Sequence, residues 1–67
     1  MNAEKMFEKL GYKKVQLISS GYIEYERFED DKCFSFDLNS EEIGVCADGI
    51  TMEELKAINK QCEELWW

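Results

Sequence analysis

The sequence predicts a small α+β protein with a short N-terminal helix, a three- to four-stranded antiparallel meander, and a C-terminal helix packed on one sheet face. Apolar residues recur at helical spacing near both ends of the chain, and they alternate with polar residues in the middle. Turn-forming residues separate the middle segments at intervals of roughly ten residues. With 67 residues, the chain fits one domain, residues 1–67.

Residues 3–10 carry the first helical pattern. Their apolar side chains recur three or four positions apart: Ala3, Met6, Phe7 and Leu10. Asn2 is suited to cap the first turn, and Gly11 is suited to end the helix in a left-handed conformation. Because this helix has only about two turns, we expect packing to hold it.

The middle of the chain predicts strands at residues 13–18, 22–28, 33–38 and 43–47, separated by turns at 19–21, 29–32 and 39–42. Apolar residues of each strand share one face, listed here as Val15 with Leu17, Ile23 with Tyr25, and Phe34 with Phe36 and Leu38. Glu24 and Glu26 take the opposite face of their strand. We therefore expect a meander with one buried face.

The C-terminal helix has the clearest local signal. Thr51 and Glu54 stand in the spacing of a capping box, and Ile50 and Leu55 in that of a hydrophobic staple. The predicted apolar stripe consists of Met52, Leu55, Ile58, Cys62, Leu65 and Trp66.

Motifs for catalysis or metal binding are weak throughout the sequence. There is no histidine, which excludes histidine triads and histidine metal sites. Cys33, Cys46 and Cys62 are spaced without a C-x-x-C pair, so we interpret them as reduced packing residues. The segment 37–48 begins like a calcium loop, but Glu42 replaces the glycine that the turn needs. We expect no enzyme activity, no cofactor and no metal.

Charge is the most informative feature for function. The net charge is −7, and residues 24–54 hold eleven acids against two basic residues. One interpretation is a solvated sheet face. The other is a surface that binds a basic protein partner, since a one-sign surface steers an oppositely charged partner. The candidate partner-binding residues are Tyr22, Glu24, Glu26, Asp30, Asp31, Asp37 and Trp67.

The last two residues are a second candidate contact. Adjacent helical side chains point about 100° apart, so Trp66 and Trp67 cannot be buried equally. We expect one indole to close the core and the other either to anchor a partner or to lie at a frayed end. A homodimer, joined through the aromatic sheet face or the tryptophans, is the alternative to a basic partner.

We expect a cytoplasmic protein that binds neither membranes nor nucleic acid directly. The first residues, MNAEKMFEKL, contain acids and lack the apolar core of a signal peptide. No apolar run approaches the ~18 residues of a membrane span. Direct nucleic-acid binding needs a basic surface, whereas this chain is acidic.

Four segments, MFEKLGYKK, IEYERF, FSFDLNSEE and ITMEELKAINKQCEEL, resemble short uncharacterised proteins carried by prophages and mobile elements of Gram-positive bacteria. Members of that group often end in Leu-Gly-Trp, whereas this chain ends in Leu65-Trp66-Trp67. The resemblance implies a bacterial host cytoplasm. It also implies, by analogy with small acidic phage proteins, an inhibitor that occupies the nucleic-acid site of a restriction or CRISPR nuclease.

Overall fold

The computed structural model describes residues 1–17 and 21–67. In chain order, the elements are α1 (Ala3–Lys9), β1 (Lys13–Leu17), β2 (Tyr22–Arg27), β3 (Lys32–Asp37), β4 (Glu42–Cys46) and α2 (Met52–Glu64). The predicted α+β fold is confirmed, with four strands in the meander. In the described residues, no helix has the length and apolar character that a membrane span requires.

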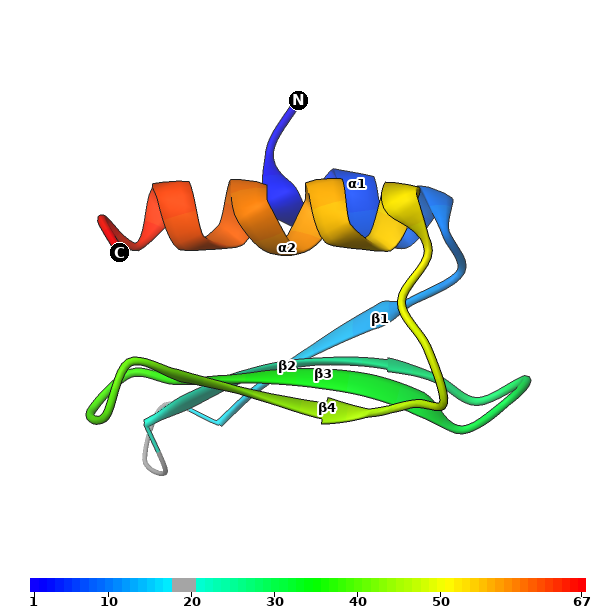
Figure 1. Cartoon of the computed structure of the whole chain (residues 1–67), viewed down its shortest axis with the longest axis horizontal. Coiled ribbons are helices and arrows are strands. Elements are labelled where there is room, and N and C mark those ends of the chain that lie inside the picture. Colours follow the sequence, from blue (N-terminus) through cyan, green and yellow to red (C-terminus); the bar gives the residue numbers. More distant parts are fainter. Residues whose placement is uncertain (18–20) are drawn as a thin grey trace.

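The four strands form one antiparallel sheet in the order β1-β2-β3-β4. Both helices lie on the same side of this sheet, with α1 behind α2 in the view of Figure 1. We call the helix-covered side the inner face and the opposite side the outer face. Because both helices lie on one side, the outer face has no covering element among the described residues.

The closing pairs of the three hairpins have the same spacing in the sequence. The closing pairs are Leu17 with Tyr22, Arg27 with Lys32, and Asp37 with Glu42. The last turn residue in each hairpin has a positive φ: 74° at Gly21, 56° at Asp31 and 57° at Glu41. Glycine adopts this conformation freely, whereas aspartate and glutamate are strained there.

The sequence placed the second and third turns one residue too late, since β3 already begins at Lys32 and β4 at Glu42. Of the predicted first turn, only Gly21 lies in the described residues. Ile18, the predicted end of the first strand, lies outside them too.

Aromatic rings from the inner face and α1 form the core. Phe7 of α1 stacks on Tyr25 of β2, with ring centroids 4.0 Å apart and planes at 14°. Phe34 and Phe36 of β3 are fully buried beside them. The strand alternation therefore predicted the buried face of β2 and β3 correctly. For β1 the expected buried face is wrong, because Val15 lies opposite Glu24 and so faces the outer side of the sheet. Asn2 caps α1, and its side chain accepts a hydrogen bond from the Lys5 N–H.

The buried side of α2 differs from the predicted stripe. The helix buries Glu54, Ala57, Ile58 and Gln61, whereas Met52, Leu55 and Trp66 are exposed. Hydrogen bonds from two tyrosines explain this orientation of the helix. The Tyr25 hydroxyl donates to Gln61 Oε1 at 2.5 Å, and the Tyr12 hydroxyl donates to Glu54. Two hydrogen-bonded polar residues thus rotate the helix away from its most apolar side.

Candidate functional site

The outer face carries side chains in three parallel rows that cross the strands. Cross-strand pairing aligns the members of each row on this face: Tyr22 with Asp37 and Glu42; Val15 with Glu24, Ser35 and Gly44; Lys13 with Glu26, Cys33 and Cys46. We call Tyr22, Glu24, Glu26, Asp37 and Glu42 the acidic face. The predicted placement of Glu24, Glu26 and Asp37 on one uncovered surface is confirmed.

Glu24 and Glu26 are the centre of the acidic face. Partial burial, together with the neighbouring carboxylate of Glu26, raises the pKa of Glu24 above its ordinary value. A raised pKa means that the folded protein holds the charged form of Glu24 at a cost. Lys13 lies opposite Glu26 in the register and supplies the nearest positive charge on this face. A basic partner would relieve the repulsion between the two carboxylates.

Gly44 opens a shallow hollow on the acidic face. The hollow has a volume of about 310 Å³ and is lined by Tyr22, Asp37 and Glu42, among others. A Cβ atom on Gly44 would lie 2.5 Å from the Ser35 hydroxyl oxygen, so the Ser35 side chain occupies the space that a side chain at position 44 would need. The hollow therefore presents the Ser35 hydroxyl beside Asp37 and Glu42.

Two of the predicted acids have structural roles inside the protein. Asp37 Oδ1 accepts from the backbone N–H groups of Asn39 and Ser40 at 2.9 and 3.2 Å, and these bonds lower the pKa of Asp37. Asp30 accepts two hydrogen bonds from the Arg27 guanidinium at 3.0 and 2.8 Å, which likewise lower its pKa. Each carboxylate is anchored, but each remains open to solvent.

Asp30 and Asp31 lie at one end of the sheet rather than on the acidic face. They line a hollow of about 430 Å³ between the β2–β3 turn and the segment that leads into α2. Cys46 and Asp48 line the same hollow. The predicted acids are therefore divided between a sheet surface and an adjoining notch at its edge.

The two C-terminal tryptophans have different surroundings. The Trp67 ring packs against Phe36, with centroids 6.2 Å apart, on the inner side of the sheet. Trp66 has a φ of 64° and is 94% exposed. Trp67 is thus remote from the acidic face, and the indole that is free to contact a partner is that of Trp66.

The cysteines are not all packing residues. Cys62 is half-buried against the core, and burial raises its pKa. Cys33 and Cys46 lie directly opposite each other on β3 and β4, and Cys46 is exposed. The prediction that all three are packing residues is therefore wrong for Cys46.

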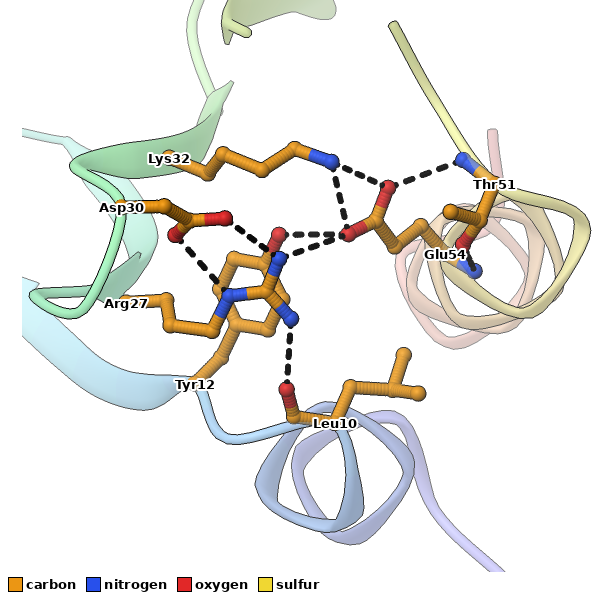
Figure 2. Close-up of polar contacts among 7 residues, drawn as sticks. All are labelled: Leu10, Tyr12, Arg27, Asp30, Lys32, Thr51 and Glu54. Carbon is orange, nitrogen blue, oxygen red and sulfur yellow. Dashed lines mark hydrogen bonds and ion pairs between the residues drawn. The ribbon is translucent and has the colours of Figure 1, made fainter.

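A buried carboxylate on the inner side has a different environment (Figure 2). Glu54 is 1% exposed and accepts hydrogen bonds from the Tyr12 hydroxyl at 2.7 Å and from Lys32 Nζ at 2.9 and 3.0 Å. The Thr51 backbone N–H donates to the same carboxylate at 2.9 Å, completing the predicted capping box. Arg27 Nη2 lies 3.6 Å from it.

Burial alone would raise the pKa of Glu54, but its hydrogen bonds from Thr51, Lys32 and Tyr12 outweigh burial and lower the pKa to about 2. Arg27 extends the cluster by donating from Nη1 to the Leu10 carbonyl oxygen at 2.8 Å. Glu54 thereby joins the end of α1, the β2–β3 hairpin and the start of α2 (Figure 2). Its full set of partners makes it a structural centre rather than a reactive group.

Sequence reasoning missed this cluster. The capping-box spacing identified Thr51 and Glu54, but Tyr12 is 42 positions and Lys32 22 positions away from Glu54. The Cys33–Cys46 pair was also missed. A signal existed for it, because both residues are equally distant from the middle of the turn at 38–41.

In the part of the chain that the structure describes, no group of three or more His, Cys, Asp or Glu side chains could hold a metal ion. The chain matches no family model, no curated protein and no solved structure. The geometry of the acidic face is therefore the main guide to function.

Proposed function

We propose that this chain is a non-enzymatic, acidic protein-binding module of phage or mobile-element type. Its acidic face binds a basic protein surface, of the kind that a host nucleic-acid enzyme presents to its substrate. In this role it would inhibit that enzyme as a nucleic-acid mimic, as anti-CRISPR and anti-restriction proteins do. The site of action would be the cytoplasm of the bacterial host.

The observation that carries the proposal is the pair of carboxylates at Glu24 and Glu26, which lie together on an uncovered sheet face. A sheet face that only needs to stay soluble can carry lysines as well as acids, and the charged residues of β1 are both lysines. Here Asp37 and Glu42 extend the same sign of charge across two further strands. Negative charge gathered on an uncovered sheet surface is complementary to a basic surface that binds a phosphate backbone.

The test is capture of partners from bacterial lysate on the immobilised protein, eluted in steps of rising salt and identified by mass spectrometry. We expect a basic nucleic-acid enzyme that elutes at raised salt, because ionic strength screens charge-mediated binding. The captured enzyme should also be displaced by duplex DNA, since both ligands would occupy one site. If duplex DNA did not displace the captured enzyme, the proposal that this protein mimics nucleic acid would be contradicted.

The variant Glu24→Lys/Glu26→Lys should abolish capture while the fold is retained. The matched control is Glu8→Lys/Glu63→Lys, which changes the net charge equally at exposed positions of α1 and α2. Capture should survive in the control. Equal loss in both variants would show that net charge alone, rather than the acidic face, drives binding.

A homodimer is the second candidate, and the edge strand β4 favours it. Ile43 and Val45 lie on the inner face beyond the helices and are 39% and 46% exposed. The opposite edge, β1, places Lys14 at its inner face, where it pairs with Glu4 at 3.7 Å. Inward charge blocks edge-to-edge pairing, and β4 has no such charge on its inner face.

A symmetric pairing of two β4 strands about Gly44 would set Ile43 of one copy opposite Val45 of the other. The aromatic sheet face cannot provide this contact, because Phe34 and Phe36 are buried. Sedimentation velocity tests the dimer: we expect self-association that strengthens with salt, as repulsion between two acidic copies is screened. Val45→Lys should abolish it, whereas a monomer at all salt concentrations would exclude the dimer.

A further inference from the structure

Cys33 and Cys46 form a cross-strand pair on the outer face. The register places them directly opposite each other on β3 and β4. Opposed residues of antiparallel strands have Cα atoms ~4.5–5.5 Å apart, which lies within the ~4.4–6.8 Å range of disulfides. Their Cβ atoms, ~4.5–5.5 Å apart, need to approach by about 1 Å. β4 can supply this movement, because it is hydrogen-bonded to the sheet on one side only.

The two thiols differ in accessibility. Cys46 is exposed and opens into the notch of about 430 Å³ at the end of the sheet. Cys33 is half-buried between Cys46 and the carboxylates of β2. Burial, contact with the Cys46 thiol and the charges of Glu24 and Glu26 raise the pKa of Cys33 to about 11. A reagent from solution therefore meets Cys46 first.

Carboxylates lie on both sides of this pair, and Lys13 lies beyond Glu26 in the same row. Glu24 and Glu26 lie on the strand next to Cys33, and Asp31 and Asp48 line the notch next to Cys46. Lys32 also lines the notch, but its ammonium group is bound to Glu54. Among the ion pairs of the described residues, none involves Asp31 or Asp48.

We propose that Cys33 and Cys46 are a modification site: a surface dithiol that reacts preferentially with cationic small-molecule disulfides and closes into a disulfide between β3 and β4. The substrate class follows from the surrounding carboxylates, which attract a cationic reagent and repel an anionic one. The product would tie the edge strand β4 covalently to its neighbour.

The chemistry is a two-step thiol–disulfide exchange. The Cys46 thiolate attacks one sulfur of the reagent, forms a mixed disulfide and expels the first thiolate. The Cys33 thiolate then attacks the Cys46 sulfur and expels the second. The protein loses two electrons and two protons, and the reagent is reduced to two thiols. Because the pKa of Cys33 is raised, little of this thiol is ionised near neutral pH, so the second step should become faster as pH rises.

The experiment compares three reagents of similar size on the reduced, full-length protein: cystamine, bis(2-hydroxyethyl) disulfide and 3,3′-dithiodipropionate. Intact mass spectrometry should show loss of two hydrogen atoms without retained reagent, and peptide mapping should join Cys33 to Cys46. At low ionic strength, cystamine should react roughly tenfold faster than the dianion, and high salt should remove most of this difference.

Variants separate the steps. Cys33→Ser should stop at a mixed disulfide on Cys46, and Cys46→Ser should form no internal bond, whereas Cys62→Ser should react like the wild type. Circular dichroism of each reduced variant checks the fold. If the wild-type product kept the reagent, or joined two chains through Cys46, the proposed internal disulfide between Cys33 and Cys46 would be refuted.

The charge preference has its own test. Glu24→Gln/Glu26→Gln removes carboxylates beside Cys33, and Asp31→Asn/Asp48→Asn removes those beside Cys46. Each double variant should reduce the advantage of cystamine over the dianion several-fold while the internal disulfide still forms. Equal rates for all three reagents on the wild-type protein would refute the proposed substrate class.

Discussion

Glu54 and Glu24 lie on opposite sides of the same sheet and have opposite electrostatic surroundings. Glu54 accepts hydrogen bonds from a lysine, a tyrosine and a backbone N–H, and its pKa is lowered. Glu24 lies beside another carboxylate, and its pKa is raised. The difference separates structural charge from available charge: the first is neutralised within the fold, and the second can be neutralised by a partner.

The largest expected effect is that of Glu54→Gln. The substitution leaves the half-buried Lys32 ammonium without its counterion, so we expect the free energy of unfolding to fall by about 3 kcal/mol. Urea denaturation measures the loss. The matched variant Glu24→Gln should cause no loss. If the two variants were equally stable, the claim that Glu54 stabilises the fold and Glu24 does not would be wrong.

The pH dependence of stability should reveal the same carboxylate. Because the pKa of Glu54 is depressed to about 2 in the folded protein, its stabilisation is present above its unfolded pKa of 4.5 and is lost as pH falls from 4.5 to 2. Thermal unfolding between pH 6 and 2 tests this. Glu54→Gln should flatten the profile in that window, and an unchanged slope would contradict the assignment.

Two tyrosines provide a smaller, matched comparison. Tyr12→Phe removes the hydroxyl that donates to buried Glu54, so we expect a loss of ~1–2 kcal/mol. Tyr22→Phe changes an exposed residue of the acidic face and should stay within ~0.5 kcal/mol of the wild type. Chemical denaturation of both variants measures the difference. A larger loss in Tyr22→Phe would reverse the proposed division of roles.

The smallest effect should have the opposite sign. Glu24→Gln removes a charge whose raised pKa shows that it is unfavourable in the fold, so stability near neutral pH should rise by a few tenths of a kcal/mol. The gain should shrink as pH falls and the wild-type carboxyl is protonated. A loss of stability on this substitution would mean that Glu24 has a structural partner after all.

The sequence allowed the faces of β2 and β3 to be predicted because alternation is local. The face of β1 was predicted wrongly, since Val15 lies opposite Glu24 on the outer side of the sheet. Ile23 and Tyr25 are buried and Glu24 and Glu26 are on the outer face, as a period of two requires. The rotation of α2 was not predictable in this way, since Glu54 and Gln61 count as surface residues until their tyrosine partners are known.

The candidate site was predictable only in part for the same reason. Cross-strand neighbours follow from the turns, so the grouping of Glu24, Glu26 and Asp37 was accessible from the pattern. The anchoring of Asp30 by Arg27 and the notch that joins Asp31 to Cys46 depend on how the turn folds beside the segment before α2. Which of Trp66 and Trp67 packs against the core depends on the positive φ at Trp66, and no spacing rule indicates that backbone conformation.

The equal spacing of the three closing pairs limits how this architecture can change in length. The closing pairs begin at residues 17, 27 and 37, so strand and turn together form a unit of ten residues. The two residues of a closing pair share a face, but each six-residue strand takes five steps, so residues one unit apart, such as Glu24 and Phe34, lie on opposite faces. Adding or deleting one unit would therefore turn every downstream side chain to the other face. It would also reverse the direction of the chain and place α2 at the opposite end of the sheet. Insertions and deletions compatible with the helix layer should therefore come in steps of two units.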